Sequence, residues 1–282
     1  MLNSETFRHL RGRARWAGDD KSPNRRRVLF GLAGAVGSMA AAPGPRLVVM
    51  VSGAFATALG ELTPIFAQRT STSLSIVLGA SMGDTPQAIP NRLARGEHAD
   101  VVILAREALD RLASNGSVRA GSEVDLVRSK VALAVKAGAP RPPISNAKQL
   151  RDALLAARSV AYSDSASGVY VSRELFARLG IADRMASKAA VVSGRPVGRA
   201  VAAGEYELGF QQLSELLPIE GITVVGLLPP EVQKVTVFSA GVAQGARDLP
   251  RARDLIGFLR SPAAAATIRR LGLEPAAMEP IR

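Results

Sequence analysis

The sequence contains no cysteine, which excludes disulfides, thiolate metal sites and cysteine nucleophiles. It has only two histidines, His9 and His98, too few for a histidine-based metal site. Aromatic residues make up 4% of the 282 residues, and the single tryptophan, Trp16, lies near the N-terminus. A stacking platform for bases or sugars is therefore not expected. We expect neither a metal nor a cofactor.

The charge balance is positive. The net charge is +12, of which residues 1–27 contribute +5 and the chain from residue 43 onward contributes +7. This balance favours a small anionic ligand. The lysines and arginines are scattered and do not form a stripe interleaved with aromatic residues, so we expect no nucleic-acid partner.

The N-terminal segment has the pattern of an export signal. Arg25 and Arg26 precede an uncharged, Gly/Ala-rich stretch at 28–42 that ends in small residues. The paired arginines resemble a twin-arginine signal, although Asn24 stands where serine or threonine is usual. The alternative is a membrane anchor, but the stretch is shorter than the roughly 20 apolar residues that a span needs. We expect a signal peptide over 1–42, cleavage near 40–42, a periplasmic location and no membrane span in the mature chain.

From residue 45 onward, short apolar runs alternate with amphipathic stretches. This pattern indicates an α/β fold with a mainly parallel sheet covered by helices on both faces, either as one large domain or as two lobes. The predicted strands are 47–51, 74–78, 101–104, 131–136, 160–162, 190–192, 208–211, 223–226 and 235–243. The predicted helices are 54–69, 88–95, 107–115, 147–157, 168–179, 197–203, 251–260 and 262–271.

Four Gly/Ser-rich turns each follow a predicted strand and open a predicted helix. They are residues 52–54, 79–83, 163–168 and 193–198. Small residues at such a turn let a ligand approach the backbone N–H groups of a helix N-terminus. Four such turns in one chain predict a cleft where they converge on a small anion.

The order of these motifs resembles the periplasmic molybdate-binding class of type II solute-binding proteins. The resemblance covers about 47–274, and its most specific element is the Leu-Ala-Arg-Gly-Glu-His-Ala-Asp-Val run at 93–101. The other elements are Val51-Ser52-Gly53-Ala54, Gly168-Val169-Tyr170, Glu207-Leu208-Gly209-Phe210 and Leu259-Arg260-Ser261-Pro262.

The resemblance implies two α/β lobes joined by two hinge strands, with an anion held between the lobes. Lobe one would comprise 45–128 and 238–282, lobe two would comprise 129–237, and the hinges would lie near 127–135 and 233–241. It also implies an ABC transporter permease as partner, and we expect a monomer.

Carried over residue by residue, the resemblance implies a set of ligand-binding positions. They are Ser52, Gly53, Ser81, Ser165, Ser167, Tyr170, Arg195, Val197 and Gln212. The pattern departs from the family at Gly53, where a serine is usual, and at Gln212, where a tyrosine is usual. We expect Gly53 to leave space and Arg195 to hold a carboxylate, so that the site takes a planar di- or tricarboxylate rather than a tetrahedral oxyanion.

Arg195 and Tyr170 each have a structural alternative to ligand binding. Arg195 can instead pair with an acidic residue at the surface, and Tyr170 can point into the cleft or into the core.

The first functional hypothesis is a solute-binding protein for a small anion. The alternative is an enzyme, because the chain also resembles bacterial periplasmic aconitate isomerases, which interconvert trans- and cis-aconitate by an allylic proton shift. That reaction needs a group that moves a proton between two carbons. No base is evident in the sequence, and the catalytic residue is left open among a serine and four other candidates, namely Tyr170, Lys130, Asp84 and Asp164.

Overall fold

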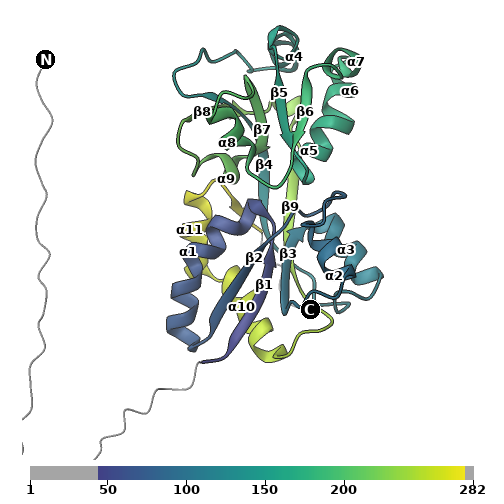
Figure 1. Cartoon of the computed structure of the whole chain (residues 1–282). Coiled ribbons are helices and arrows are strands. Elements are labelled where there is room, and N and C mark those ends of the chain that lie inside the picture. Colours follow the sequence, from purple (N-terminus) through teal and green to yellow (C-terminus); the bar gives the residue numbers. More distant parts are fainter. Residues whose placement is uncertain (1–43, 277–282) are drawn as a thin grey trace, which may run out of the picture. The chain divides into compact units, whose positions relative to one another are not determined.

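The computed structural model describes residues 44–276, which belong to one compact unit. Ten strands of this part of the chain form a mixed sheet in the order β2-β1-β3-β9-β4-β7-β5-β6, with β8 and β10 also paired to β4. Figure 1 shows the arrangement of strands β1 to β9. The predicted signal peptide lies outside the described residues. No helix within 44–276 is both long enough and apolar enough to cross a membrane.

The nine predicted strands are all present, within two residues at each end except for β4, which begins seven residues earlier. The strands are β1 Arg46–Val51, β2 Ser73–Leu78, β3 Val101–Ala105, β4 Val124–Lys136, β5 Val160–Ser163, β6 Ala189–Val192, β7 Leu208–Gln212, β8 Ile222–Leu227, β9 Val235–Val242 and β10 Glu274–Pro275.

The eight predicted helices also form, and the structure adds two short ones, α7 and α9. The α-helices are α1 Gly53–Thr70, α2 Ile89–Ala94, α3 Arg106–Ser114, α4 Ala147–Ala156, α5 Ala166–Tyr170, α6 Phe176–Arg178, α7 Ala182–Met185, α8 Val197–Ala202, α9 Leu213–Leu216, α10 Leu249–Arg260 and α11 Pro262–Arg270. A π-helical turn, Val171–Leu175, joins α5 to α6, and a short 3₁₀ turn, Pro230–Val232, precedes β9.

The expectation of a mainly parallel sheet is wrong at its centre. The pairs β1–β2, β1–β3, β5–β6 and β5–β7 are parallel, whereas β9 is antiparallel to both β3 and β4. The cause is the long strand β4, whose first part, up to Lys130, pairs with β9. Its second part, from Val131, pairs antiparallel with β7 and β8. Strands β4 and β9 thus run between the two halves of the sheet (Figure 1).

Each half of the sheet buries its own core. In the first half, β1, β3 and β9 pack against α1, α10 and α11 around residues such as Phe55 and Phe66. In the second half, β4, β5 and β7 pack against α4 and α5 around Leu133 and Phe210. The two cores share no residue, and the lobe boundaries at 128/129 and 237/238 stay a prediction.

Local chemistry defines several helix ends. The Asn146 side chain accepts a hydrogen bond of 2.9 Å from the Gln149 N–H and so caps α4, as its residue type predicts. Gly180 follows α6 with a φ of 65°, a conformation that favours glycine and ends the helix.

Candidate functional site

A cavity of about 450 Å³ lies between the two halves of the sheet. This volume falls in the roughly 300–1,000 Å³ range of small-molecule sites. All four Gly/Ser-rich turns contribute residues to this one cavity. The contributing turn residues are Gly53; Gly79 and Ala80; Ser163, Asp164 and Ser165; and Gly194, Arg195 and Pro196. The turns therefore converge as the sequence predicts.

The two halves contact each other around the cavity. The Ser81 N–H donates to Ser165 Oγ over 3.1 Å, which joins the loop after β2 to the loop after β5. Ser214 Oγ of α9 donates to the Ala54 carbonyl oxygen of α1 over 2.8 Å. Gly83 has a φ of 107°, and a Cβ there would lie 2.6 Å from the Asp164 carbonyl oxygen, so only glycine fits this contact.

Three of the nine predicted ligand-binding residues line the cavity, namely Gly53, Ser165 and Arg195. The other six are buried and lie outside the lining. They are Ser52, Ser81, Ser167, Tyr170, Val197 and Gln212.

Several of these buried groups are engaged by other protein atoms. Ser81 Oγ accepts from the Ala105 N–H over 3.0 Å, and the Val197 N–H donates to Gln211 Oε1 over 2.9 Å. Ser167 Oγ lies 3.0 Å from Ser163 Oγ. These contacts position the turns that surround the cavity.

Tyr170 points into the core. Its ring is 2% exposed within the second core, and its hydroxyl donates to the Val232 carbonyl oxygen. Gln212 lies where β7 meets β4, and its Nε2 donates to Thr236 Oγ1 over 3.3 Å. Among the described residues, Gln212 Oε1 has no hydrogen-bond partner.

Two arginines line the cavity and differ in their partners. Arg195 forms a two-pronged ion pair with Glu205, with Nη1 donating to Oε1 over 2.8 Å. This pair lowers the pKa of Glu205, mainly through the hydrogen bonds from Arg195, and it is the surface pairing that the sequence left open. Arg199 is exposed, and its side chain makes no hydrogen bond or ion pair with another residue of 44–276, so its guanidinium can bind an anion.

Glu215 is a cavity residue that the sequence reasoning missed. It lies on α9, a turn of four residues directly after β7, and its Oε1 accepts from Gln211 Nε2 over 2.9 Å. Burial raises the pKa of its carboxyl from the ordinary 4.5 to about 7, against the lowering effect of the Gln211 hydrogen bond. The available signal was its position at the carboxyl end of a strand, where α/β sheets place ligand sites.

Gly53 does not leave open space, contrary to the expectation from sequence. A Cβ at this position would lie 2.2 Å from Glu215 Oε1. The carboxyl of Glu215 therefore occupies the volume that a serine side chain would need.

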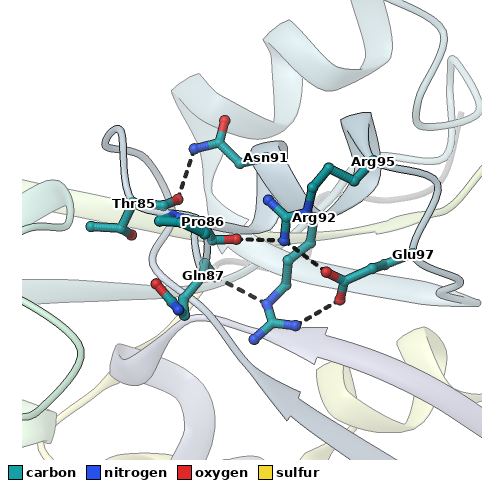
Figure 2. Close-up of polar contacts among 7 residues, drawn as sticks. All are labelled: Thr85, Pro86, Gln87, Asn91, Arg92, Arg95 and Glu97. Carbon is teal, nitrogen blue, oxygen red and sulfur yellow. Dashed lines mark hydrogen bonds and ion pairs between the residues drawn. The ribbon is translucent and has the colours of Figure 1, made fainter.

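The loop before α2 reaches the cavity through Thr85 and Gln87. Figure 2 shows how the 91–97 segment holds this loop. Asn91 Nδ2 donates to the Thr85 carbonyl oxygen over 2.8 Å, and Arg92 Nε donates to that of Gln87 over 3.2 Å.

Glu97 in turn fixes the two arginines of this segment. It accepts from Arg92 over 2.6 Å and from Arg95 over 2.7 Å, while Arg95 also donates to the Pro86 carbonyl oxygen over 2.7 Å (Figure 2). The hydrogen bonds from Arg95 and Arg92 lower the pKa of Glu97. The run with the most specific resemblance therefore supports one wall of the cavity.

The other proton-transfer candidates are spread over the molecule. Lys130 pairs with Glu274 over 2.7 Å, and neither it nor the exposed Asp84 lines the cavity. Asp164 does line it, together with residues from α1. In the described part of the chain, no three His, Asp or Glu side chains gather as metal ligands.

A two-part α/β fold with two connecting strands and a cavity between the parts defines the class of type II periplasmic binding proteins. The family model described as "Bacterial extracellular solute-binding protein" matches residues 47–274, and the chain belongs to this family. Membership implies a small ligand and an ABC transporter.

Solved structures share the fold of this chain, and one curated relative is similar to it in sequence. The periplasmic molybdate-binding protein of Azotobacter vinelandii superimposes with a TM-score of 0.62 at 20% identity, over 83% of this chain and 100% of that one. A sulfate-binding protein of Mycobacterium tuberculosis H37Rv superimposes with a TM-score of 0.65 at 16% identity, over 82% and 87%. An aconitate isomerase of Pseudomonas sp. is 46% identical over 242 residues, which cover 86% of this chain and 92% of the relative.

Proposed function

We propose that this protein is an isomerase that interconverts trans- and cis-aconitate in the cavity between its two halves. The observation that carries the proposal is the position of the Glu215 carboxyl in the wall of a cavity that Arg195 and Arg199 also line. Burial there raises the pKa of this carboxyl to about 7. A carrier protein needs only to hold its ligand, whereas a group that takes up and returns protons near neutral pH suits general acid–base chemistry. The aconitate isomerase at 46% identity supports the choice of substrate.

The charges of the cavity suit a polycarboxylate. Arg199 offers a guanidinium without a protein partner, and Arg195 offers a second one that a ligand carboxylate can share with Glu205. A guanidinium holds a planar carboxylate with two parallel hydrogen bonds. Thr57, Thr85 and Gln87 add hydroxyl and amide groups to the same walls, so that several carboxylates can be bound at once.

Turnover of trans-aconitate tests the proposal. The protein is incubated with a thousandfold excess of trans-aconitate, without added metal or nucleotide, and the vinylic and methylene signals are followed by proton NMR. We expect conversion to a mixture of the trans and cis isomers over many turnovers. Unchanged trans-aconitate at catalytic and at equimolar protein would refute the isomerase.

The second candidate function is a periplasmic, monomeric solute-binding protein that delivers a small anion to an ABC transporter. Its support is the family match over 47–274 and the fold shared with molybdate- and sulfate-binding proteins. In that case, calorimetry should detect tight binding of a di- or tricarboxylate, or of molybdate, without turnover. Gel filtration with light scattering should give the mass of one chain.

A further inference from the structure

The surroundings of Glu215 distinguish it from the other acidic residues of the protein. Its carboxyl lies between α9 and the start of α1, where the absence of a side chain at Gly53 makes room for it. Gln211 Nε2 donates to Oε1 over 2.9 Å. This bond fixes the carboxyl in the cavity wall.

None of the positively charged side chains that line the cavity is paired with the Glu215 carboxyl. The loop after β5 contributes Asp164, whose like charge disfavours ionisation of Glu215, and α8 with its preceding turn contributes Arg195 and Arg199. The cavity-lining residues of α1 and of the loop after β2 carry no charge. No lysine or arginine of residues 44–276 forms an ion pair with Glu215, while Arg195 is paired with Glu205. The carboxyl is thus free to gain and lose a proton.

We propose that Glu215 is the catalytic residue that carries the proton in the allylic shift, an inference that rests on the proposed isomerase function. In its ionised form, Glu215 removes a proton from the methylene carbon of the substrate. The C–H bond breaks, an O–H bond forms on the carboxyl, and the electron pair joins the adjacent double bond in a delocalised carbanion. Glu215 then returns the proton to the carbon at the other end of the three-carbon unit, and the double bond has moved.

This step is balanced without any further reactant. One C–H bond is broken and one is formed, the O–H bond on Glu215 is transient, and there is no net change in protons or oxidation state. Guanidinium groups at the substrate carboxylates stabilise the negative charge that the carbanion spreads onto them. Gly53 takes part as the residue that makes room for the carboxyl.

The test compares Glu215→Gln with wild type and with the matched control Glu174→Gln, which alters an exposed glutamate of the π-helical turn. For Glu215→Gln, we expect kcat for trans-aconitate to fall by about 10²–10⁴-fold, the usual contribution of a general base. The Kd for trans-aconitate, from calorimetry, should stay within about tenfold, and Glu174→Gln should match wild type. Asp164→Asn tests the other carboxyl that lines the cavity, and this variant should lose less activity than Glu215→Gln.

The pH profile gives a second readout. The wild-type kcat/KM should fall with decreasing pH below about 7, because the base must be ionised to accept a proton. The residual activity of Glu215→Gln should lack this dependence. Glu215→Asp, which withdraws the carboxyl by one methylene, serves as a second variant and should also lose most of kcat while folding normally.

The outcomes distinguish the role of Glu215 from the isomerase function itself. If wild type converts aconitate and Glu215→Gln keeps kcat within about threefold, or Asp164→Asn loses more than Glu215→Gln, the role of Glu215 is refuted and the isomerase stands. If wild type itself does not turn over aconitate, the proposed function fails and the role of Glu215 fails with it.

Discussion

The raised pKa of Glu215 predicts a pH-dependent cost to stability that Glu215→Gln removes. The carboxyl ionises near 4.5 in the unfolded chain and near 7 in the folded protein. Between these values, the unfolded state binds fewer protons than the folded state, so the free energy of unfolding falls as the pH rises from about 4.5 to about 7. Below 4.5 both states are protonated, and above 7 the effect is complete.

The shift from 4.5 to about 7 corresponds to about 3 kcal/mol. This figure is an upper limit, because Glu215 keeps part of its surface toward the cavity, where water screens its charge. Part of this effect is already present at pH 5, so Glu215→Gln should gain up to about 2.5 kcal/mol of stability relative to wild type between pH 5 and pH 8.

The assay is urea unfolding of both proteins at pH 5 and pH 8, followed by far-ultraviolet circular dichroism. Fluorescence is unsuitable, because Trp16, the single tryptophan of the sequence, lies in the predicted signal peptide. Glu174→Gln serves as the control and should follow wild type at both values. The idea that Glu215 ionises near pH 7 would be refuted by either of two results. The free energies of unfolding of Glu215→Gln and wild type could differ by the same amount at pH 5 and pH 8, or the variant could lose stability relative to wild type as the pH rises.

Three further substitutions test separate parts of the structure. Gly53→Ala should displace the Glu215 carboxyl, because the new Cβ would lie 2.2 Å from its oxygen, and kcat should drop by at least tenfold while circular dichroism stays unchanged; full activity would contradict this contact. Tyr170→Phe should lower the free energy of unfolding in urea by about 1–2 kcal/mol, because it leaves the buried Val232 carbonyl without its hydrogen-bond donor, and it should not change ligand affinity. A large loss of affinity would instead place the hydroxyl at the ligand. Glu97→Gln should raise KM severalfold and speed amide hydrogen exchange in the loop before α2, with little change in the urea midpoint. Unchanged exchange would show that Glu97 is not needed to hold the loop.

Much of the fold was accessible from the sequence because its strands are short apolar runs bounded by turns. The main strand error concerns the first part of β4, where Asp125, Arg128 and Lys130 interrupt the apolar pattern. These residues lie where β4 pairs with β9, and Lys130 finds its partner in Glu274, which is remote in sequence. The antiparallel centre of the sheet depends on such pairings between residues distant in sequence, and it was therefore not predicted.

The candidate site was predicted at the level of loops better than at the level of side chains. The four turns were recognisable from their glycines and serines, and they converge on one cavity. Glu215 was missed because α9 spans only four residues, too few to show a periodic pattern. The direction of Tyr170 could not be decided, because the first turn of a helix has both a core face and a cleft face, and only the packing of the second core selects between them.

A crystal structure of Glu215→Gln with trans-aconitate would show directly whether the substrate lies against residue 215. We expect the ligand in the cavity between the two halves, with a carboxylate on Arg199 and the methylene carbon about 3–3.5 Å from the side chain of residue 215. Aconitate bound elsewhere, or bound in the cavity with both reacting carbons turned away from residue 215, would contradict it.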